Sequence, residues 1–545
     1  MKEKFKVVLI NPSNNEAHVG NYAPTEHLGL AYLTAVLRQE GYWVKIIDAY
    51  ALNITKEEVI EEVTAIQPNF VGITAEYNTI EVATYLIKTF REKLEGAHLS
   101  MGGQHATFSA NELLSEVTEL DSILRGEGEI TIVEVMNRLH DGKSLDGILG
   151  AYYRGVDGSV LKNGDRPAIA DLDSLPFPAR DTLIECQKRG ITPAISVLSS
   201  RGCQANCSFC NASKYFSLGG GNKWRGRSPE NIVDEIEELK RVFGDTKIYD
   251  VVYFSDENFV GPGQAGLDRV ADIADEIKNR NIDVSYEIFC RADSFNNRED
   301  LVRKLSESGL ISALIGLESG YQKSLNKFSK GTTVNSNLNT IELFKKYRII
   351  TSSSGFLMFN PYSTFEEIEE NAKFLLKIGM STLYNMSLKV LGYPGLRYVQ
   401  QLEDDELLTE DFSHKNVEGY KFKDSRLKDL VKAVAFDESL GRREDSSHRY
   451  LDISLTDLDR KLCLTEYMDN ESLKKGRSLV EDSRFTSQLV TYNFFIKLVS
   501  LAEMGWSEDI FTKYKKRYIV EIDEALNSMN LVYENYIDLL NEIIE

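Results

Sequence analysis

Three cysteines stand close together in the stretch SSRGCQANCSFCNASKYF, residues 199–216. Where thiols stay reduced, grouped cysteines indicate metal binding or catalysis rather than disulfides. A closed zinc site needs four ligands, whereas three thiolates in one loop suit an iron–sulfur cube in which one iron stays open to a small molecule. The alternative is a loop whose cysteines bind nothing. The grouped residues are Cys203, Cys207 and Cys210, and the unpaired others are Cys186, Cys290 and Cys463.

In the N-terminal part of the chain, which precedes this loop, short apolar segments alternate with longer amphipathic ones. FKVVLIN, WVKIID and FVGITAE have strand length, whereas LGLAYLTAVLRQEG and IEVATYLIKTFREKL have helix length. Such alternation is typical of a parallel sheet with helices on both faces. We therefore predict an α/β, doubly wound (Rossmann-like) domain over residues 1–145.

Polar residues follow the apolar runs of this domain. Ligands of doubly wound sheets bind beyond the carboxyl ends of the strands, so these residues are binding candidates. A glycine pair among them lets the backbone approach a flat or bulky ligand closely. The candidates are Asn11-Pro12-Ser13, Asp48, Thr74-Ala75-Glu76, Gly102-Gly103-Gln104-His105 and Arg125-Gly126-Glu127-Gly128-Glu129.

A second series of elements follows a Pro- and Asp-rich stretch without periodicity, GDRPAIADLDSLPFPARD, which predicts a linker over residues 146–188. Over residues 189–400, strand-length runs, about six, again alternate with helical segments, which predicts a full or partial β/α (TIM) barrel with its site at the strand C-termini. The cysteine loop directly follows the first run, AISVLSS. Residues 401–545 are mostly helical in pattern. We expect them to form a cap that packs on the barrel and shapes the substrate cavity, and a partner-binding module is the alternative.

The cysteine loop resembles the cluster motif of the radical S-adenosylmethionine (SAM) superfamily. The shared features are the spacing Cys203-x3-Cys207-x2-Cys210, Phe209 just before the last cysteine, and a strand in front of the loop. The resemblance implies a [4Fe-4S] cluster held by the three cysteines, with SAM on the open iron. It also implies cleavage of SAM to a 5′-deoxyadenosyl radical that abstracts hydrogen from a substrate.

Four later segments, YFSDENF, FCRAD, IGLESG and GFLMFNP, match the SAM-binding pattern of that family. The resemblance implies that Asp256 and Glu257 accept hydrogen bonds from the SAM ammonium, and that Arg291 pairs with its carboxylate. It places Glu318 near the ribose hydroxyls and Pro361 against the adenine. Acidic residues and glycines also end strands for purely structural reasons, which is the alternative for each one alone.

The N-terminal domain resembles the cobalamin-binding domain that precedes the barrel in one large class of these enzymes. The segments NYAPTEHLGLAYLTAVLRQEGYWVKIID, GGQHATF, RGEGE and LPFPARD carry this resemblance. For His105, contact with the nucleotide tail of cobalamin and capping of the next helix are both open. The resemblance implies cobalamin contacts at Thr74, Ala75, Glu76, Gly102, Gly103, Gln104, His105, Gly126 and Glu127.

The loop after the first strand departs from one cobalamin pattern. Domains that bind through a histidine carry Asp-x-His-x-x-Gly, whereas this chain has NNEAHVG, with Glu16, His18 and Gly20. The acid differs and the spacing to glycine is one residue short. An axial ligand and a solvated loop residue therefore both stay open for His18, and members of the class commonly bind cobalamin without this motif.

With both cofactors, the resemblance implies methylation of an unactivated carbon of a small, natural-product-type molecule through methylcobalamin. Ring formation, rearrangement or oxidation with the same cofactors is the alternative. Methylthiolation would need a second cluster held by cysteines of the N-terminal domain, which contains none. An iron–sulfur sensor would not need the SAM contacts Arg291 and Glu318.

The composition limits which binding partners and which cellular compartment we expect for the protein. A net charge of −21 argues against a general affinity for nucleic acid, which requires clustered Lys and Arg. No stretch approaches the roughly 18 consecutive apolar residues of a membrane span, and the N-terminus resembles a first strand rather than a signal peptide. We expect a cytoplasmic protein without a membrane partner, which receives electrons from an external donor of flavodoxin or ferredoxin type.

Overall fold

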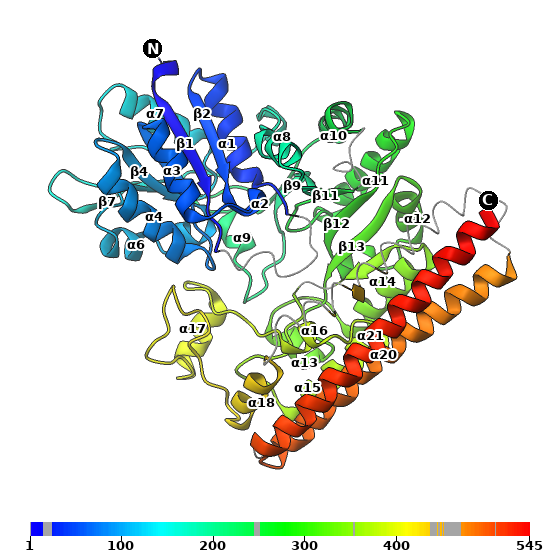
Figure 1. The fold of residues 1–545 in the computed structure, drawn as a ribbon. Coiled ribbons are helices and arrows are strands. Elements are labelled where there is room, and N and C mark those ends of the chain that lie inside the picture. The colour runs from blue at the N-terminus through cyan, green and yellow to red at the C-terminus, as the bar shows by residue number, and fades with distance from the viewer. Residues whose placement is uncertain are drawn as a thin grey trace.

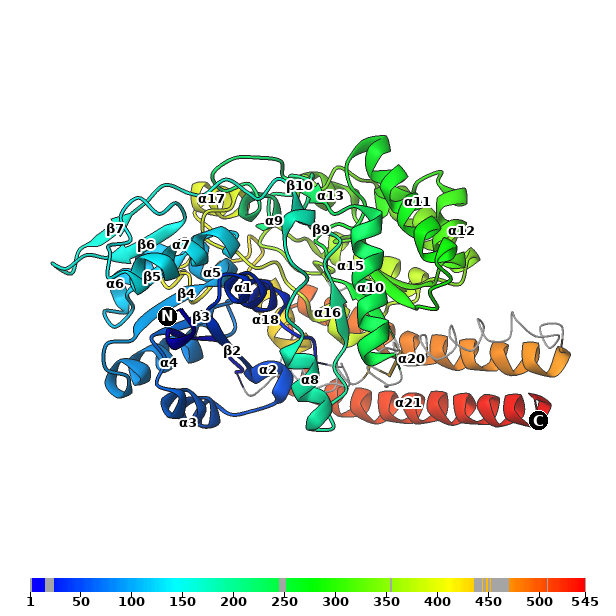
Figure 2. The same cartoon turned by 90° about the horizontal axis from the view of Figure 1, so that it is seen from above.

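The computed structural model describes residues 2–14, 24–244, 251–352, 355–435, 444, 447–448, 451, 470–506 and 508–544. Two mainly parallel sheets occupy the N-terminal and central parts of the chain, and a long helical hairpin runs along the central part (Figures 1 and 2). Among the described helices, none combines the length and the apolar character that crossing a bilayer requires.

The first sheet has the strand order β2-β1-β3-β4-β5-β6-β7. Strands β1 to β5 pair in parallel, and β6 and β7 extend one edge in antiparallel pairing. The carboxyl ends of β1 to β5 therefore lie along one edge of the domain. The strands are β1 (Lys6–Asn11), β2 (Trp43–Asp48), β3 (Phe70–Thr74), β4 (His98–Gly102), β5 (Ser122–Leu124), β6 (Ala151–Arg154) and β7 (Val160–Lys162).

Helices cover both faces of this sheet because successive side chains of a strand point to opposite sides. Val7 and Leu9 pack in one apolar cluster with α1 and α7, and Val8 and Ile10 pack in another with α3 and α4. The predicted doubly wound domain is thus confirmed. The helices are α1 (Leu28–Gln39), α3 (Lys56–Ile66), α4 (Ile80–Lys93) and α7 (Glu129–His140).

The sheet of the first domain ends at Lys162 rather than at residue 145. Strands β6 and β7 lie inside the segment 146–188 that the sequence predicted as a linker. Both strands are short and flank a turn whose Gly158 N–H donates to the carbonyl oxygen of Gly155, 2.9 Å away. So few residues leave no period for a sequence pattern to reveal. The segment ends in helix α8 (Asp181–Lys188).

The second sheet has five parallel strands in the order β14-β13-β12-β11-β8, which makes an open, partial barrel. A sixth position is marked only by an isolated parallel bridge between Phe359 and Lys389. Helices α10 (Pro229–Phe243), α11 (Gly263–Asn279) and α15 (Phe365–Ile378) pack on this sheet. The strands are β8 (Ile195–Val197), β11 (Val252–Phe254), β12 (Tyr286–Arg291), β13 (Leu310–Gly316) and β14 (Ile350–Ser352).

Two buried networks of arginine and glutamate join the domains. Arg180 pairs with Glu26 and with Glu235 of α10, and Glu235 also pairs with Arg227. The carboxyl oxygens of Glu127 and Glu129, in the first domain, accept hydrogen bonds from the arginines of a hairpin that leads into and out of the cysteine loop. Because a buried charge is tolerated only when it is paired, these contacts hold the two sheets in one relative position. That hairpin comprises β9 (Ser200–Gly202), with Arg201, and β10 (Trp224–Gly226), with Arg225.

The C-terminal part is helical and packs on the central domain. Helices α20 (Glu471–Glu503) and α21 (Glu508–Ile544) form the long hairpin of Figure 1. Their apolar side chains belong to the same buried cluster as those of the barrel, and the rings of Phe495 and Phe359 lie 6.3 Å apart. Along the chain, α17 (Arg397–Asp404) and α18 (Arg426–Val434) come between the barrel and this hairpin.

Candidate active site

The three grouped cysteines line one cavity of about 530 Å³ at the carboxyl ends of the barrel strands. The loop between them is fixed from outside: the Ser208 N–H donates to the carbonyl oxygen of Phe328 (2.9 Å), and the Ser208 carbonyl accepts from the Tyr398 N–H (3.1 Å). Phe209 lines the cavity and packs edge-on against Phe328, with ring centroids 5.3 Å apart. The placement of the cysteines and of Phe209 thus agrees with the predicted cluster loop.

The three thiols share one cavity, and a four-iron cube takes each cysteine on a different iron, so the cysteines can hold the predicted cluster. Burial raises the pKa of Cys203, and that of Cys210 to about 11. Thiolate ligation there must therefore release protons.

Two cationic side chains face the cysteines. The Arg291 Nη1 atom lies 3.7 Å from Cys207 Sγ, while its guanidinium also donates to Asp293 and to the Lys330 carbonyl oxygen (2.6 Å). Lys330 forms a buried ion pair with Glu318. Burial acts to lower the pKa of Lys330, but Glu318 and Cys207 outweigh it and raise that pKa. The cavity thus offers positive charge for a carboxylate beside the cluster cysteines.

Adjacent acidic residues after β11 face different ways. Glu257 lines the cavity, its carboxylate accepts from the Gly202 N–H (2.9 Å), and burial raises its pKa to about 7. Asp256 does not line the cavity, and it accepts hydrogen bonds from the backbone N–H groups of Ser199 and Ser200, each at 2.8 Å. The two neighbouring carboxyl groups thus point to different places. Glu257 lies where the predicted contact with SAM is possible, whereas Asp256 binds the backbone at the start of β9.

The segment that follows β14 reaches the cavity earlier than the sequence suggested. Gly355, Phe356 and Leu357 line the cavity, whereas Pro361 does not. The Pro361 carbonyl oxygen accepts from the Lys423 N–H, 2.9 Å away, on the outer side of the segment. Pro361, for which an adenine contact was predicted, therefore lies outside the cavity, and Gly355–Leu357 line it instead.

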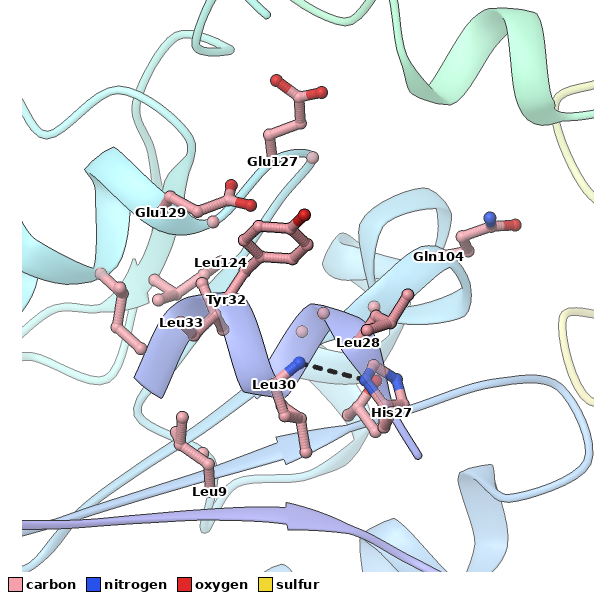
Figure 3. Close-up of a pocket in the computed structure, with 18 of the residues that line it drawn as sticks. Leu9, His27, Leu28, Leu30, Tyr32, Leu33, Gln104, Leu124, Glu127 and Glu129 are labelled. Carbon is pink, nitrogen blue, oxygen red and sulfur yellow. Dashed lines mark hydrogen bonds between the residues drawn. The ribbon is translucent and has the colours of Figure 1, made fainter. Parts of the chain in front are cut away.

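A second cavity, of about 300 Å³, lies at the carboxyl edge of the first sheet. Figure 3 shows its apolar wall, formed by leucines of α1 and by Leu124, with Glu127 and Glu129 at one side and Gln104 at another. The backbone forms part of this wall. Gly103 has φ +92°, and a Cβ atom there would lie 2.7 Å from Thr74 Oγ1. No side chain larger than hydrogen fits at residue 103 without displacing this wall.

The second cavity has the features of a binding site for a large, partly polar group. Thr74 Oγ1 and Glu129 Oε2 are buried and have no hydrogen-bond partner among the described residues, although both residues line the cavity. Glu76 also lines it and accepts from the Gln104 N–H (3.3 Å), and burial raises its pKa to about 7. Buried polar groups of this kind are ordinarily satisfied, so a bound ligand is the natural partner. The residues fit cobalamin.

Most of the predicted cobalamin contacts come together here, and two do not. Thr74, Glu76, Gly102, Gly103, Gln104, Gly126 and Glu127 line the second cavity. Ala75 does not, since its N–H serves to link β3 to β4 through the Gly102 carbonyl oxygen (2.8 Å). His105 does not either. It is buried against His414, with Nε2 and Nδ1 3.2 Å apart, and burial together with that neighbour lowers its pKa to about 4.

Several residues of the two sites carried no sequence signal or lie outside the described residues. Lys330, Lys389 and Tyr393 line the cluster cavity, yet no motif or spacing in the sequence marks any of the three. Described residues beyond Tyr393 line neither cavity, so the C-terminal helices pack on the barrel without shaping either wall. The loop residues Glu16, His18 and Gly20, and also Cys463, lie outside the described residues.

Comparison with protein families identifies both halves of the site. Residues 197–375 match the radical SAM superfamily, and residues 19–136 match the B12 binding domain. The chain is 32% identical over 397 residues to "Uncharacterized methyltransferase PH0819" of Pyrococcus horikoshii. This match covers 72% of this chain and 82% of that protein. It is 29% identical over 384 residues to the anaerobic magnesium-protoporphyrin IX monomethyl ester cyclase of Rubrivivax gelatinosus, which covers 68% of this chain and 65% of that protein.

A solved structure shows the same fold. The cobalamin-dependent S-adenosylmethionine radical enzyme OxsB, solved with aqua-cobalamin and S-adenosylmethionine bound, superimposes with a TM-score of 0.73 at 20% identity. The match covers 98% of this chain and 80% of that one. The architecture of N-terminal α/β domain, partial barrel and helical C-terminal part is therefore shared. The chain belongs to the radical SAM enzymes that carry an N-terminal B12 binding domain, as the resemblances of its cysteine loop and of its N-terminal segments implied.

Proposed function

We propose that the protein is a cobalamin-dependent radical SAM methyltransferase that acts on an unactivated carbon of a small molecule. The observation that carries the proposal is the meeting of two different cofactor cavities, each at the carboxyl edge of a parallel sheet, at one shared residue, Gln104. Bound together, the three cofactors supply a hydrogen-abstracting 5′-deoxyadenosyl radical and a transferable methyl group. The name of the Pyrococcus relative supports methyl transfer.

The residues of the cluster cavity divide into those that hold the cofactors and those that face the substrate. In this proposal Cys203, Cys207 and Cys210 hold the [4Fe-4S] cluster. Glu257 accepts hydrogen bonds from the SAM ammonium, Arg291 and Lys330 bind its carboxylate, and Glu318 orients Lys330. Of Asp256 and Glu257, the two carboxylates that directly follow β11, only Glu257 lines the cavity, which supports its role.

The cobalamin cavity holds its ligand mainly through backbone and small side chains. Gly102 and Gly103 let the strand end approach the corrin or its tail closely. Thr74 and Glu129 supply polar atoms that have no other described partner. Both domains are fixed by the buried ion pairs, so the two ligands face each other without a large closing motion.

The remaining wall of the cluster cavity supports a small-molecule substrate. Phe356, Leu388, Val390 and Tyr393 make it largely apolar, and Lys389, paired with Glu418, is its main charge. A compact, mostly apolar molecule with a polar end fits such a wall, and a polynucleotide does not. An external one-electron donor of flavodoxin or ferredoxin type would reduce the cluster.

Isotope labelling tests the proposal even while the substrate is unidentified. Anaerobically reconstituted protein receives SAM with a deuterated methyl group, cobalamin, a reductant and a low-molecular-weight cell extract. We expect a compound that gains the labelled methyl, together with S-adenosylhomocysteine and 5′-deoxyadenosine in equal amounts. A Cys207→Ala variant should give none of the three.

The same assay distinguishes methyl transfer from its main alternative, ring formation or oxidation. Because the Rubrivivax relative is named as a cyclase, ring formation or oxidation with the same cofactors is the second candidate. It predicts substrate-dependent 5′-deoxyadenosine without S-adenosylhomocysteine and without a labelled product. That outcome would replace methyl transfer while keeping the radical SAM chemistry.

A further inference from the structure

Gln104 occupies a singular position between the two cavities. Among the described residues it alone lines both the cobalamin cavity and the cluster cavity. In Figure 3 its carboxamide lies apart from Glu127 and Glu129, at the side of the cavity where other segments of the chain approach. A side chain in this place touches whatever occupies either cavity.

The backbone of Gln104 is fixed to the cobalamin side. Gly103, just before it, has φ +92° and is packed against Thr74 and Ala75, so the turn from β4 into the next helix has no freedom to shift. The Gln104 N–H donates to Glu76 Oε1, 3.3 Å away at the end of β3. The main chain of residue 104 is therefore part of the cobalamin cavity.

The side chain of Gln104 is fixed to the cluster side. Its Oε1 atom accepts a hydrogen bond of 3.1 Å from Asn211 Nδ2. Asn211 directly follows the cluster cysteine Cys210 and is the N-cap residue of α9 (Ala212–Tyr215). The Gln104 Nε2 group makes no hydrogen bond to any described residue, so its protons remain available to a ligand in the shared space.

We propose that Gln104 is a positioning residue that couples the two cofactor sites through its hydrogen bond to Asn211. A ligand that contacts one side of Gln104 shifts or fixes a carboxamide that is bonded directly to the residue after Cys210. Occupancy of one cavity then changes the affinity of the other, and such coupling is reciprocal by thermodynamic necessity. This inference rests on the proposed function, because it requires cobalamin and SAM in one protein.

The size of the effect follows from the contact. The bond between Gln104 and Asn211 is partly buried, and one hydrogen bond of this kind changes an equilibrium by about fivefold at room temperature. We therefore expect saturating SAM to change the dissociation constant of cobalamin by about fivefold in the unmodified protein. The cob(II)alamin electron paramagnetic resonance (EPR) spectrum should also change when SAM is added, because Gln104 faces both ligands.

The experiment measures binding rather than turnover. Cluster-reconstituted protein is titrated anaerobically with hydroxocobalamin, with and without saturating SAM and without reductant, and the absorbance of bound cobalamin is followed. The variants are Gln104→Ala, Asn211→Ala and the double variant.

Each single alanine variant should abolish the effect of SAM, and the double variant should do no more, since both remove the same bond. Lys214→Ala is the matched control. Lys214 lies on the same helix α9, donates to the Gly395 carbonyl oxygen (2.7 Å) and lines neither cavity, so its removal should leave the coupling intact.

The outcomes separate this inference from the proposed function. If both ligands bind but SAM leaves cobalamin affinity unchanged in the unmodified protein, the coupling is wrong while the proposed function stands. The coupling is equally wrong if Gln104→Ala keeps the full effect of SAM, or if the two single variants act additively. If cobalamin or SAM does not bind at all, it is the proposed function that fails.

Discussion

Replacement of Gly103 by alanine is the sharpest test of the cobalamin cavity. Two costs follow from the structure. A residue with a side chain at φ +92° carries backbone strain of about 1–3 kcal/mol. Its Cβ would also lie 2.7 Å from Thr74 Oγ1 and 3.0 Å from the Ala75 carbonyl oxygen. Overpacking of this kind costs about 1–3 kcal/mol more, and the resulting displacement affects the wall of the cobalamin cavity.

The two costs can be separated with a second glycine. Gly41 also has a positive φ, +84°, but a Cβ there meets no atom within 4 Å. Gly41→Ala therefore carries the strain without the clash. We expect Gly103→Ala to weaken cobalamin binding at least about tenfold, which corresponds to about 1.4 kcal/mol, and Gly41→Ala to leave that affinity unchanged.

The assay is a cobalamin titration followed by absorbance, with the iron content of the reconstituted protein measured in parallel. Iron content should stay unchanged in both variants, because the cysteines lie in the other domain. If Gly103→Ala binds cobalamin as tightly as the unmodified protein, the strand end at residue 103 does not form the cofactor wall and the site is wrongly placed.

The remaining predictions concern the cluster cavity. Lys330→Ala should reduce SAM affinity by about tenfold or more and destabilise the fold, because it leaves buried Glu318 unpaired. The double variant Lys330→Met with Glu318→Gln should regain stability but not SAM affinity. Thermal unfolding measures the stability, and calorimetric titration measures the SAM affinity. Glu257, with a pKa raised to about 7, is ionised in about a tenth of molecules at pH 6 and in half at pH 7, so SAM affinity should rise about fivefold over that range. Glu257→Gln should flatten this profile, and a profile unchanged by that substitution would remove Glu257 from the ammonium site. Asp256→Asn should lower stability through its bonds to Ser199 without changing the pH profile.

The parts of the site that sequence predicted correctly are those encoded by short, local patterns. Cys203, Cys207 and Cys210 lie within one loop, and the polar ends of β3 and β4 follow obvious apolar runs. Parallel strands bring such ends to one edge whatever the details of packing. This is why the two cavities, and the cysteines and strand-end residues that line them, were predictable without a structure.

What sequence missed depends on register and on long-range contacts. The choice between Asp256 and Glu257 is set by which of the two side chains the bend after β11 directs into the cavity, and no local pattern records that choice. Lys330 reaches the cluster from a loop whose sequence has no period. The short strands β6 and β7 exist because a sheet edge is available, which no local pattern records.

The buried arginine–glutamate networks have a consequence for protein engineering. One network joins three parts of the chain, and its charged groups are almost fully shielded from water. Its residues are Glu26 of the N-terminal segment, Arg180 of the connecting segment, and Arg227 and Glu235 at and before the first barrel helix. A chimera that took its cobalamin half from one enzyme and its barrel from another would leave some of these charges unmatched, at a cost of about 3–5 kcal/mol for each broken pair. A stable chimera therefore has to take all the paired residues of both networks from the same parent enzyme.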